Sequence, residues 1–144
     1  MRRASIFVLI LGGAALACVL TACGSRQAAG PAPSLVRVKE SDYRIVLRPA
    51  RIHAGRVRIT VDNLGPANHE LILVHALRAG LPVRTDGLTV NEEALQSDEV
   101  AALEPAVPGT IRHLDVDLPK GDYEVFCNMA GHYMGGMRAF LVVT

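Results

Sequence analysis

The sequence predicts an all-β fold, a sandwich of two sheets with about seven short strands. Apolar and polar residues alternate with a period of two through segments such as 43–48 and 56–61, which is the pattern of a half-buried strand. Turn-forming stretches, "DNLGPAN" and "PKGD" among them, separate these segments. Short strands divided by regular turns are typical of a two-sheet sandwich.

Seven segments have the strand pattern. They begin at Leu35, Asp42, Arg56, Glu70, Thr110, Asp122 and Arg138. The stretch "TVNEEALQSDEVAALEPAVPG" departs from this pattern, because Asn91 and Ser97 are possible helix N-caps followed by acidic residues. Pro105 and Pro108 would end any helix there. We therefore expect a short helical insertion, of one helix or two, between the strands.

Length and composition indicate one small globular domain. The chain has 144 residues, of which 50% are hydrophobic, and this suffices for a single core. Aromatic residues make up 4% and tryptophan is absent, so the core must be aliphatic. The formal net charge is +1 and no basic block is present, which argues against nucleic-acid binding.

The first 22 residues have the features of an export signal. Arg2 and Arg3 precede the apolar stretch "SIFVLILGGAALACVL", and small residues precede Cys23. The ending "LTAC" resembles a bacterial lipobox, which implies that signal peptide 1–22 is removed and that Cys23 is lipidated. The alternative is an uncleaved transmembrane anchor, for which the apolar stretch is marginal in length. Either way we expect an exported, membrane-attached domain on the periplasmic or extracellular face of a bacterial cell membrane or outer membrane.

The segment that follows the leader predicts a spacer before the folded domain. Residues 23–34 are small and contain proline and glycine, so we expect a flexible tether, followed by a domain over residues 35–144. Loss of Arg2 and Arg3 with the leader reduces the 15 basic residues to 13, against 14 acidic residues, for a formal charge of −1. We expect a monomer with a nearly neutral surface.

The number of cysteines draws attention to Cys127. Of the three cysteines, Cys18 belongs to the leader and Cys23 to the lipidation motif, which leaves Cys127 alone. A single thiol is unusual in an exported domain, because oxidising compartments favour disulfides. Cys127 is therefore a buried bystander, an intermolecular bridge or a metal ligand, and its neighbours favour the last.

The run "CNMAGHYMGGM" places Cys127, His132 and Met137 in one glycine-containing loop between two predicted strands. A thiolate, an imidazole and a thioether form a soft donor set that suits copper, and blue-copper sites add a second histidine to this set. His69 is the best candidate for that histidine, because it lies where the "NLGPAN" turn meets a strand.

The segments "DNLGPANHEL" and "LPKGDYEVFCNMAGHYMGGM", with the final strand, resemble the cupredoxins, the small blue-copper proteins of the plastocyanin and azurin kind. The resemblance covers residues 35–144 and implies a cupredoxin-like Greek-key β-sandwich holding one copper ion, Cu(I) or Cu(II). It also implies ligation by the Nδ1 atoms of His69 and His132, by the Cys127 thiolate, and by Met137 through a long axial bond.

The sequence departs from the family directly after His69. Plastocyanins and azurins usually have there an asparagine that braces the ligand loop, whereas this chain has Glu70, which we expect to point away as an ordinary strand residue. Met134 is a rival axial ligand, but the spacing of Met137 from His132 matches the family.

The remaining methionines and histidines are expected to lie outside the metal site. Met129 and Met134 would pack around the ligand loop or form an apolar patch for a redox partner. His53, His75 and His113 have no partner at ligand spacing, and we expect surface or structural roles for them.

The resemblance implies an electron carrier that serves an unidentified redox protein. The alternative is copper sequestration, or copper delivery to a cuproenzyme, without electron transfer. An enzyme is disfavoured, because the sequence has no His-x-His pair of a multicopper oxidase. The loop also has one cysteine, Cys127, whereas binuclear copper centres need two.

Overall fold

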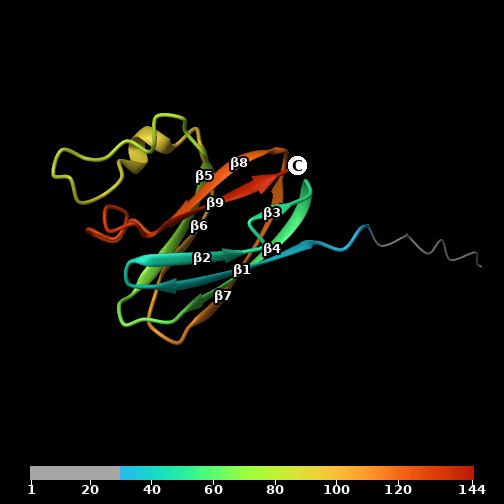
Figure 1. Ribbon diagram of the computed structural model, residues 1–144, viewed down its shortest axis with the longest axis horizontal. Coiled ribbons are helices and arrows are strands. Elements are labelled where there is room, and N and C mark those ends of the chain that lie inside the picture. Colours follow the sequence, from blue (N-terminus) through green and yellow to red (C-terminus); the bar gives the residue numbers. More distant parts are fainter. Residues whose placement is uncertain (1–29) are drawn as a thin grey trace, which may run out of the picture. The chain divides into compact units, whose positions relative to one another are not determined.

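The computed structural model describes residues 30–144, which form nine strands in two sheets and one 3-10 turn (Figure 1). The first sheet has the order β2 (Arg44–Arg48), β1 (Ser34–Ser41), β4 (Gly55–Asn63), β7 (Ile111–Leu118). The second has the order β3 (Arg51–Ile52), β9 (Arg138–Val143), β8 (Gly121–Phe126), β5 (His69–His75), β6 (Glu99–Ala106). The predicted all-β sandwich is confirmed, and all seven expected strands are present.

Alternation of side chains along the strands builds the core. In β1, Val36 and Val38 are buried while Arg37 and Lys39 are exposed, as the period of two requires. β1 pairs in parallel with β4 and antiparallel with β2, so it lies inside its sheet. The main core between the sheets is aliphatic, as the composition predicted, with Tyr123 as its one fully buried aromatic residue among the described part of the chain.

The expected helical insertion is largely wrong. Asn91 precedes a single 3-10 turn, η1 (Glu92–Leu95), and makes no side-chain capping hydrogen bond. The segment after Ser97, where a second helix was possible, forms strand β6, which pairs antiparallel with β5. An isolated short helix is marginal in stability, whereas the pairing supplies backbone hydrogen bonds and packs Leu103 against the core. Pro105 is tolerated because β6 is an edge strand.

The connection that contains η1 covers the outer face of the second sheet. Leu81, Val90 and Leu95 are buried there against Phe126 and Tyr133 in a second hydrophobic cluster. Tyr133 belongs to the loop after β8, so this second cluster packs against that loop on the side opposite the main core.

The predicted signal peptide 1–22 and the lipidation site Cys23 lie outside the described residues, as does the predicted tether up to residue 29. β1 begins at Ser34, the last residue assigned to the tether. Within residues 30–144, no helix has the length and apolar character needed to cross a membrane.

Candidate metal centre

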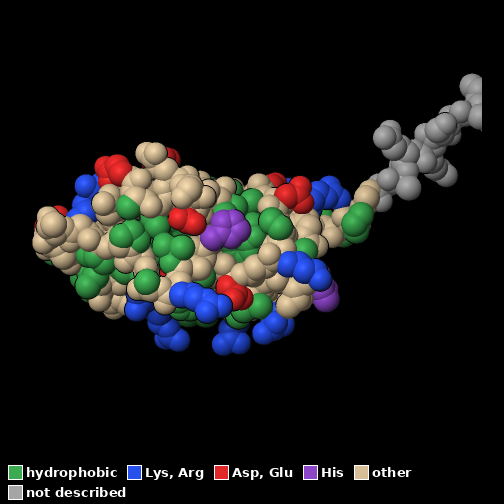
Figure 2. Space-filling view, turned by 90° about the horizontal axis from the view of Figure 1, so that it is seen from above, with side chains coloured by type: hydrophobic (Ala, Val, Ile, Leu, Met, Phe, Trp, Pro, Cys, Tyr) green, Lys and Arg blue, Asp and Glu red, His purple; other side chains and the backbone are tan. Residues whose placement is uncertain are grey.

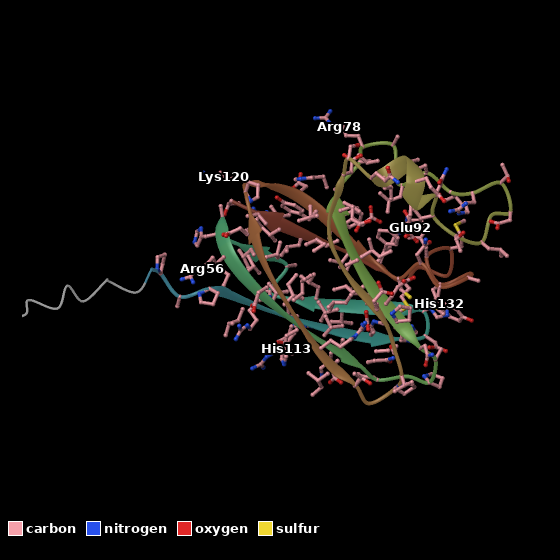
Figure 3. All side chains as sticks on the ribbon, turned by 180° about the vertical axis from the view of Figure 1, so that it is seen from behind. Arg56, Arg78, Glu92, His113, Lys120 and His132 are labelled. Atoms are coloured by element: carbon pink, nitrogen blue, oxygen red, sulfur yellow. The ribbon has the colours of Figure 1, made fainter. Side chains whose placement is uncertain are left out.

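His69, Cys127 and His132 converge at one end of the sandwich, and we call these three residues the donor cluster. The two Nδ1 atoms are 3.2 Å apart, and Cys127 Sγ lies 3.4 Å from Nδ1 of His132 and 3.9 Å from Nδ1 of His69. Cys127 and His69 are fully buried, and His132 is 9% exposed. Figure 3 shows His132 at the end of the molecule away from Arg56.

Two of the three donors are held by strand ends, and His132 lies in the loop between β8 and β9. His69 is the first residue of β5, and Cys127 directly follows the last residue of β8. The Cys127 N–H donates to the Met137 carbonyl (3.1 Å), and the Met137 N–H donates to the His132 carbonyl (3.0 Å). These bonds close residues 127–137, the ligand loop, into a compact turn.

Glycine lets the ligand loop pack against the β1–β2 turn. A Cβ atom on Gly135 would lie 2.8 Å from the Tyr43 ring, so only glycine allows this close approach. Gly136 has φ of +99°, a left-handed conformation that other residues rarely adopt. The Tyr43 ring in turn packs edge-on against the His132 imidazole, with centroids 5.3 Å apart.

The methionines divide between the interior and the surface. Met137 is fully buried and belongs to the same core cluster as Cys127. Met134 is 56% exposed, which turns it toward solvent. Met129 is partly buried against the main core. Of the two methionines considered for the axial position, Met137 is the one enclosed with the thiol.

The other three histidines are exposed and lie outside the donor cluster. His75 packs against the ring of Tyr123, and His113 Nδ1 is 3.2 Å from Thr60 Oγ1. His53 is exposed between β3 and β4. Among the described residues, the donor cluster alone brings three histidine, cysteine or acidic side chains within metal-binding distance.

No protein-family model matches the sequence, and no curated protein matches it. Solved structures do. An auracyanin of the photosynthetic bacterium Roseiflexus castenholzii is 18% identical with a TM-score of 0.56, over 80% of this chain and 99% of that one. Auracyanin A, described as a "blue" copper protein of Chloroflexus aurantiacus, is 21% identical with a TM-score of 0.55, over 78% of this chain and 100% of that one. Reduced rusticyanin is 17% identical with a TM-score of 0.58, over 82% of this chain and 87% of that one.

The fold is that of the cupredoxins. The expected cupredoxin-like Greek-key sandwich is thereby confirmed for the described domain. Because all these identities are low, the similarity concerns the fold, and the chemistry of the site has to be argued from this chain's own residues.

The expectation that Glu70 points away from the site is wrong. Its Oε1 accepts a hydrogen bond from the N–H of Asn128 (3.0 Å), the residue directly after Cys127. Glu70 thus braces the start of the ligand loop. Burial raises the pKa of Glu70, and the nearby Glu92 carboxylate raises it further.

Asn128 extends this brace to the connection over the second sheet. Its Oδ1 accepts from the Val90 N–H (2.6 Å), and its Nδ2 donates to the Val90 carbonyl (3.1 Å) and to Glu92 Oε1 (2.5 Å). The start of the ligand loop is therefore tied to β5 on one side and to η1 on the other. The sequence singled out Glu70 as a departure from the family, but it did not predict that the side chain turns toward the ligand loop.

Asp42 is a site residue that the sequence analysis missed. Its Oδ1 lies 2.9 Å from His69 Nε2 and accepts a hydrogen bond from the Ala67 N–H (3.2 Å). The carboxylate lies on the far side of the His69 ring, which leaves Nδ1 directed into the donor cluster. Second partners of this kind commonly orient metal-binding histidines. Only the three-dimensional contact between the β1–β2 turn and β5 reveals it.

The protonation states suit metal binding. Burial, and the neighbouring His132, lower the pKa of His69, so its imidazole is neutral at neutral pH and offers a lone pair. Burial raises the pKa of the Cys127 thiol to about 11, so the metal-free protein holds the proton on sulfur. A thiolate-binding metal would displace that proton, which makes metal affinity pH-dependent. Two imidazole nitrogens and a thiol fit a copper ion.

Proposed function

We propose that this protein is a mononuclear type 1 copper protein that carries single electrons. The observation that supports it best is the donor cluster, in which two Nδ1 atoms and a buried thiol converge beside the enclosed Met137. A bound copper ion would supply the one-electron Cu(I)/Cu(II) couple. That similar folds include a described blue copper protein agrees with the proposal.

In this proposal the chain's own residues keep the site rigid and dry. His69 and His132 would hold the copper ion through Nδ1, Cys127 would lose its thiol proton and bind as a thiolate, and Met137 would offer its thioether as a further, weaker ligand. The backbone hydrogen bonds of the ligand loop and the Glu70 brace hold these donors in one arrangement. A fixed donor set limits the rearrangement that would oppose electron transfer.

His132 is the proposed route for the electron. It is the one donor with exposed surface, and apolar side chains lie around that end of the sandwich. Tyr43, Leu64, Val107 and Met134 are each more than half exposed there, in the turns next to His69 and His132. An apolar rim around the edge of a mostly buried imidazole fits a redox protein partner that docks without strong charge pairing.

Export and anchoring are part of the same proposal. Lipidation at Cys23 after removal of residues 1–22 would hold a monomeric carrier beside membrane-bound redox complexes. Mass spectrometry of the N-terminal peptide from the native host would detect the acylated Cys23. An unmodified Cys23 attached to residues 1–22 would instead support the transmembrane anchor.

Copper handling without electron transfer is the second candidate. The exposed thioether of Met134 favours it, because a soft donor at the surface suits capture of Cu(I). In this case the protein would sequester copper or pass it to a cuproenzyme.

A Cu(II) titration of the full chain separates the two. We expect one equivalent of Cu(II) to produce an intense thiolate-to-copper band in the visible, absent from Cys127→Ser and retained by Met134→Leu. Binding of Cu(I) without any visible band for Cu(II) would contradict the electron carrier and favour copper handling.

A further inference from the structure

The outward face of β1 and β2 carries an unusual set of cations. Arg37 and Lys39 of β1 and Arg48 of β2 are exposed, and Arg37 lies directly opposite Arg48 in the strand register. We call these three residues the cationic face. Like charges directly opposite each other on neighbouring strands are unfavourable. The arrangement therefore does not serve the stability of the isolated domain.

No carboxylate in the described part of the chain forms an ion pair with the cationic face. The arginine ion pairs there involve Arg58, Arg84 and Arg112. Residues 1–29 contain no aspartate or glutamate, and Glu40 of β1 is buried on the inner side of its sheet. Figure 2 shows Lys and Arg side chains gathered along the lower rim of the view. Lys39 lies opposite Asp62 of β4 in the strand register, whereas Arg37 lies opposite Thr60 of β4 and Arg48 of β2. Arg37 and Arg48 thus have no carboxylate opposite them and can attract an external anion.

The same face is hollowed. A shallow cavity of about 600 Å³ is lined by the three cations together with Leu35, Val46 and Pro49. Its surface is therefore apolar between the charges. A purely ionic partner would use the cations and leave the apolar residues uncovered, whereas an amphiphilic anion would use both.

The chain enters the domain beside this face. Arg56 Nη2 donates to the Pro31 carbonyl (2.6 Å), and β1 begins three residues later. The apolar stretch of the leader ends shortly before Cys23. Residues 24–33 can extend over about 35 Å at most. Membrane attachment at or before Cys23 would therefore keep the cationic face within reach of lipid headgroups.

We propose that the cationic face binds anionic phospholipid, with the phosphate between Arg37, Lys39 and Arg48 and the apolar part of the lipid in the hollow. Binding would lay β1 along the membrane surface. The donor cluster lies beyond the opposite end of β1, next to Asp42 and Tyr43, and stays uncovered for a partner. This inference does not depend on which metal the site holds.

Vesicle partitioning of the full chain tests the proposal. The ratio of its affinity for equimolar phosphatidylcholine–phosphatidylglycerol vesicles to its affinity for phosphatidylcholine vesicles reports the anionic preference, while the leader contributes equally to every variant. We expect Arg37→Gln with Arg48→Gln to lower this ratio about 30-fold. The control, Arg78→Gln with Lys120→Gln, removes the same charge at exposed positions that Figure 3 labels away from β1, and should leave the ratio nearly unchanged.

A second arm distinguishes lipid from an acidic protein surface. Leu35→Ser, at a 64% exposed position, should weaken binding to the anionic vesicles and leave binding to soluble polyglutamate unchanged. Equal losses in the two charge-matched double variants would overturn the proposal. The opposite outcome has two parts: the wild type binds polyglutamate as strongly as the anionic vesicles, and Leu35→Ser weakens neither interaction. That outcome would assign the face to an acidic protein instead. Circular dichroism confirms that each variant is folded.

Discussion

Two buried polar clusters lie side by side near the same end of the sandwich, and they are satisfied in different ways. Glu40 and Arg112 form an ion pair inside the protein, with Oε2 and Nη2 2.6 Å apart. The donor cluster has no carboxylate at its centre, where Nδ1 of His132 faces Nδ1 of His69 and Sγ of Cys127. The Glu40 charge contributes to the raised pKa of Cys127, and the Arg112 charge to the lowered pKa of His69.

The ion pair and the donor cluster differ in whether their polar groups are paired within the chain, and this difference indicates which one stabilises the fold and which one binds a metal. A buried charge has to be paired within the chain, because an unpaired one is very costly. Neutral donors can remain together without such a partner, and they become a binding site when a cation arrives. The stability of the metal-free protein should therefore depend on the ion pair, and metal binding on the donor cluster.

Breaking the ion pair should have the largest effect on stability. Arg112→Met leaves Glu40 buried without its partner and should lower the free energy of unfolding by about 3–5 kcal/mol at pH 8. At pH 5 the loss should be much smaller, because Glu40 is then protonated. Arg58→Met, which breaks the exposed pair with Asp115, is the control and should change stability little. Urea unfolding measures both, and equal effects would contradict the distinction.

The second largest effect should be a pH dependence of the free energy of unfolding that comes from Glu40. Burial raises its pKa from 4.5 to about 7, although Arg112 opposes the shift. The folded state therefore holds a proton that the unfolded state releases, so stability falls as the pH rises from about 4.5 to about 7. The loss amounts to about 3 kcal/mol. Glu70 and Glu124 shift in the same direction, so the difference between wild type and Glu40→Gln isolates Glu40. An unchanged slope in Glu40→Gln would show that Glu40 does not titrate there.

The brace on the ligand loop should contribute less. Glu70→Ala leaves the Asn128 N–H without its acceptor and should cost about 1–2 kcal/mol. Glu70→Gln keeps an oxygen in the same place and should retain most of that stability. Hydrogen exchange of the Asn128 amide provides the local measurement, with faster exchange expected in Glu70→Ala alone. Equal protection in both variants would rule out the brace.

Loss of a donor should have the smallest effect on the metal-free protein. His132 lies at the surface edge of the cluster, so His132→Gln should change the free energy of unfolding by less than about 1 kcal/mol. The same substitution should remove the visible copper band. A large loss of metal-free stability would mean that His132 is a structural residue.

The pattern of alternating residues predicted most of the fold, because each strand buries one face and the period is visible locally. The exceptions are β3, a strand of two residues, and β6, where Asn91, Ser97 and the following acids have helix-start features. Pairing with β5 decided that segment, and Leu103 packs on the core as a result. Such pairing is a long-range contact that a local pattern does not contain.

The sequence predicted the donor residues better than the residues that hold them in place. His69, Cys127 and His132 have side chains whose chemistry is rare enough to stand out, and the structure brings them together. Asp42 and Glu70 are common surface residue types, and their roles depend on which turn or loop they face. Their directions follow from the packing of the β1–β2 turn and the ligand loop against β5.

X-ray absorption at the copper edge tests the central claim most directly. Copper-loaded protein should show one sulfur at short distance and two imidazole nitrogens, in both the oxidised and the reduced state. This result is expected because Cys127, His69 and His132 are already held together without the metal. A shell without the short sulfur, or one that changes its ligands between Cu(II) and Cu(I), would contradict an electron carrier built on this cluster.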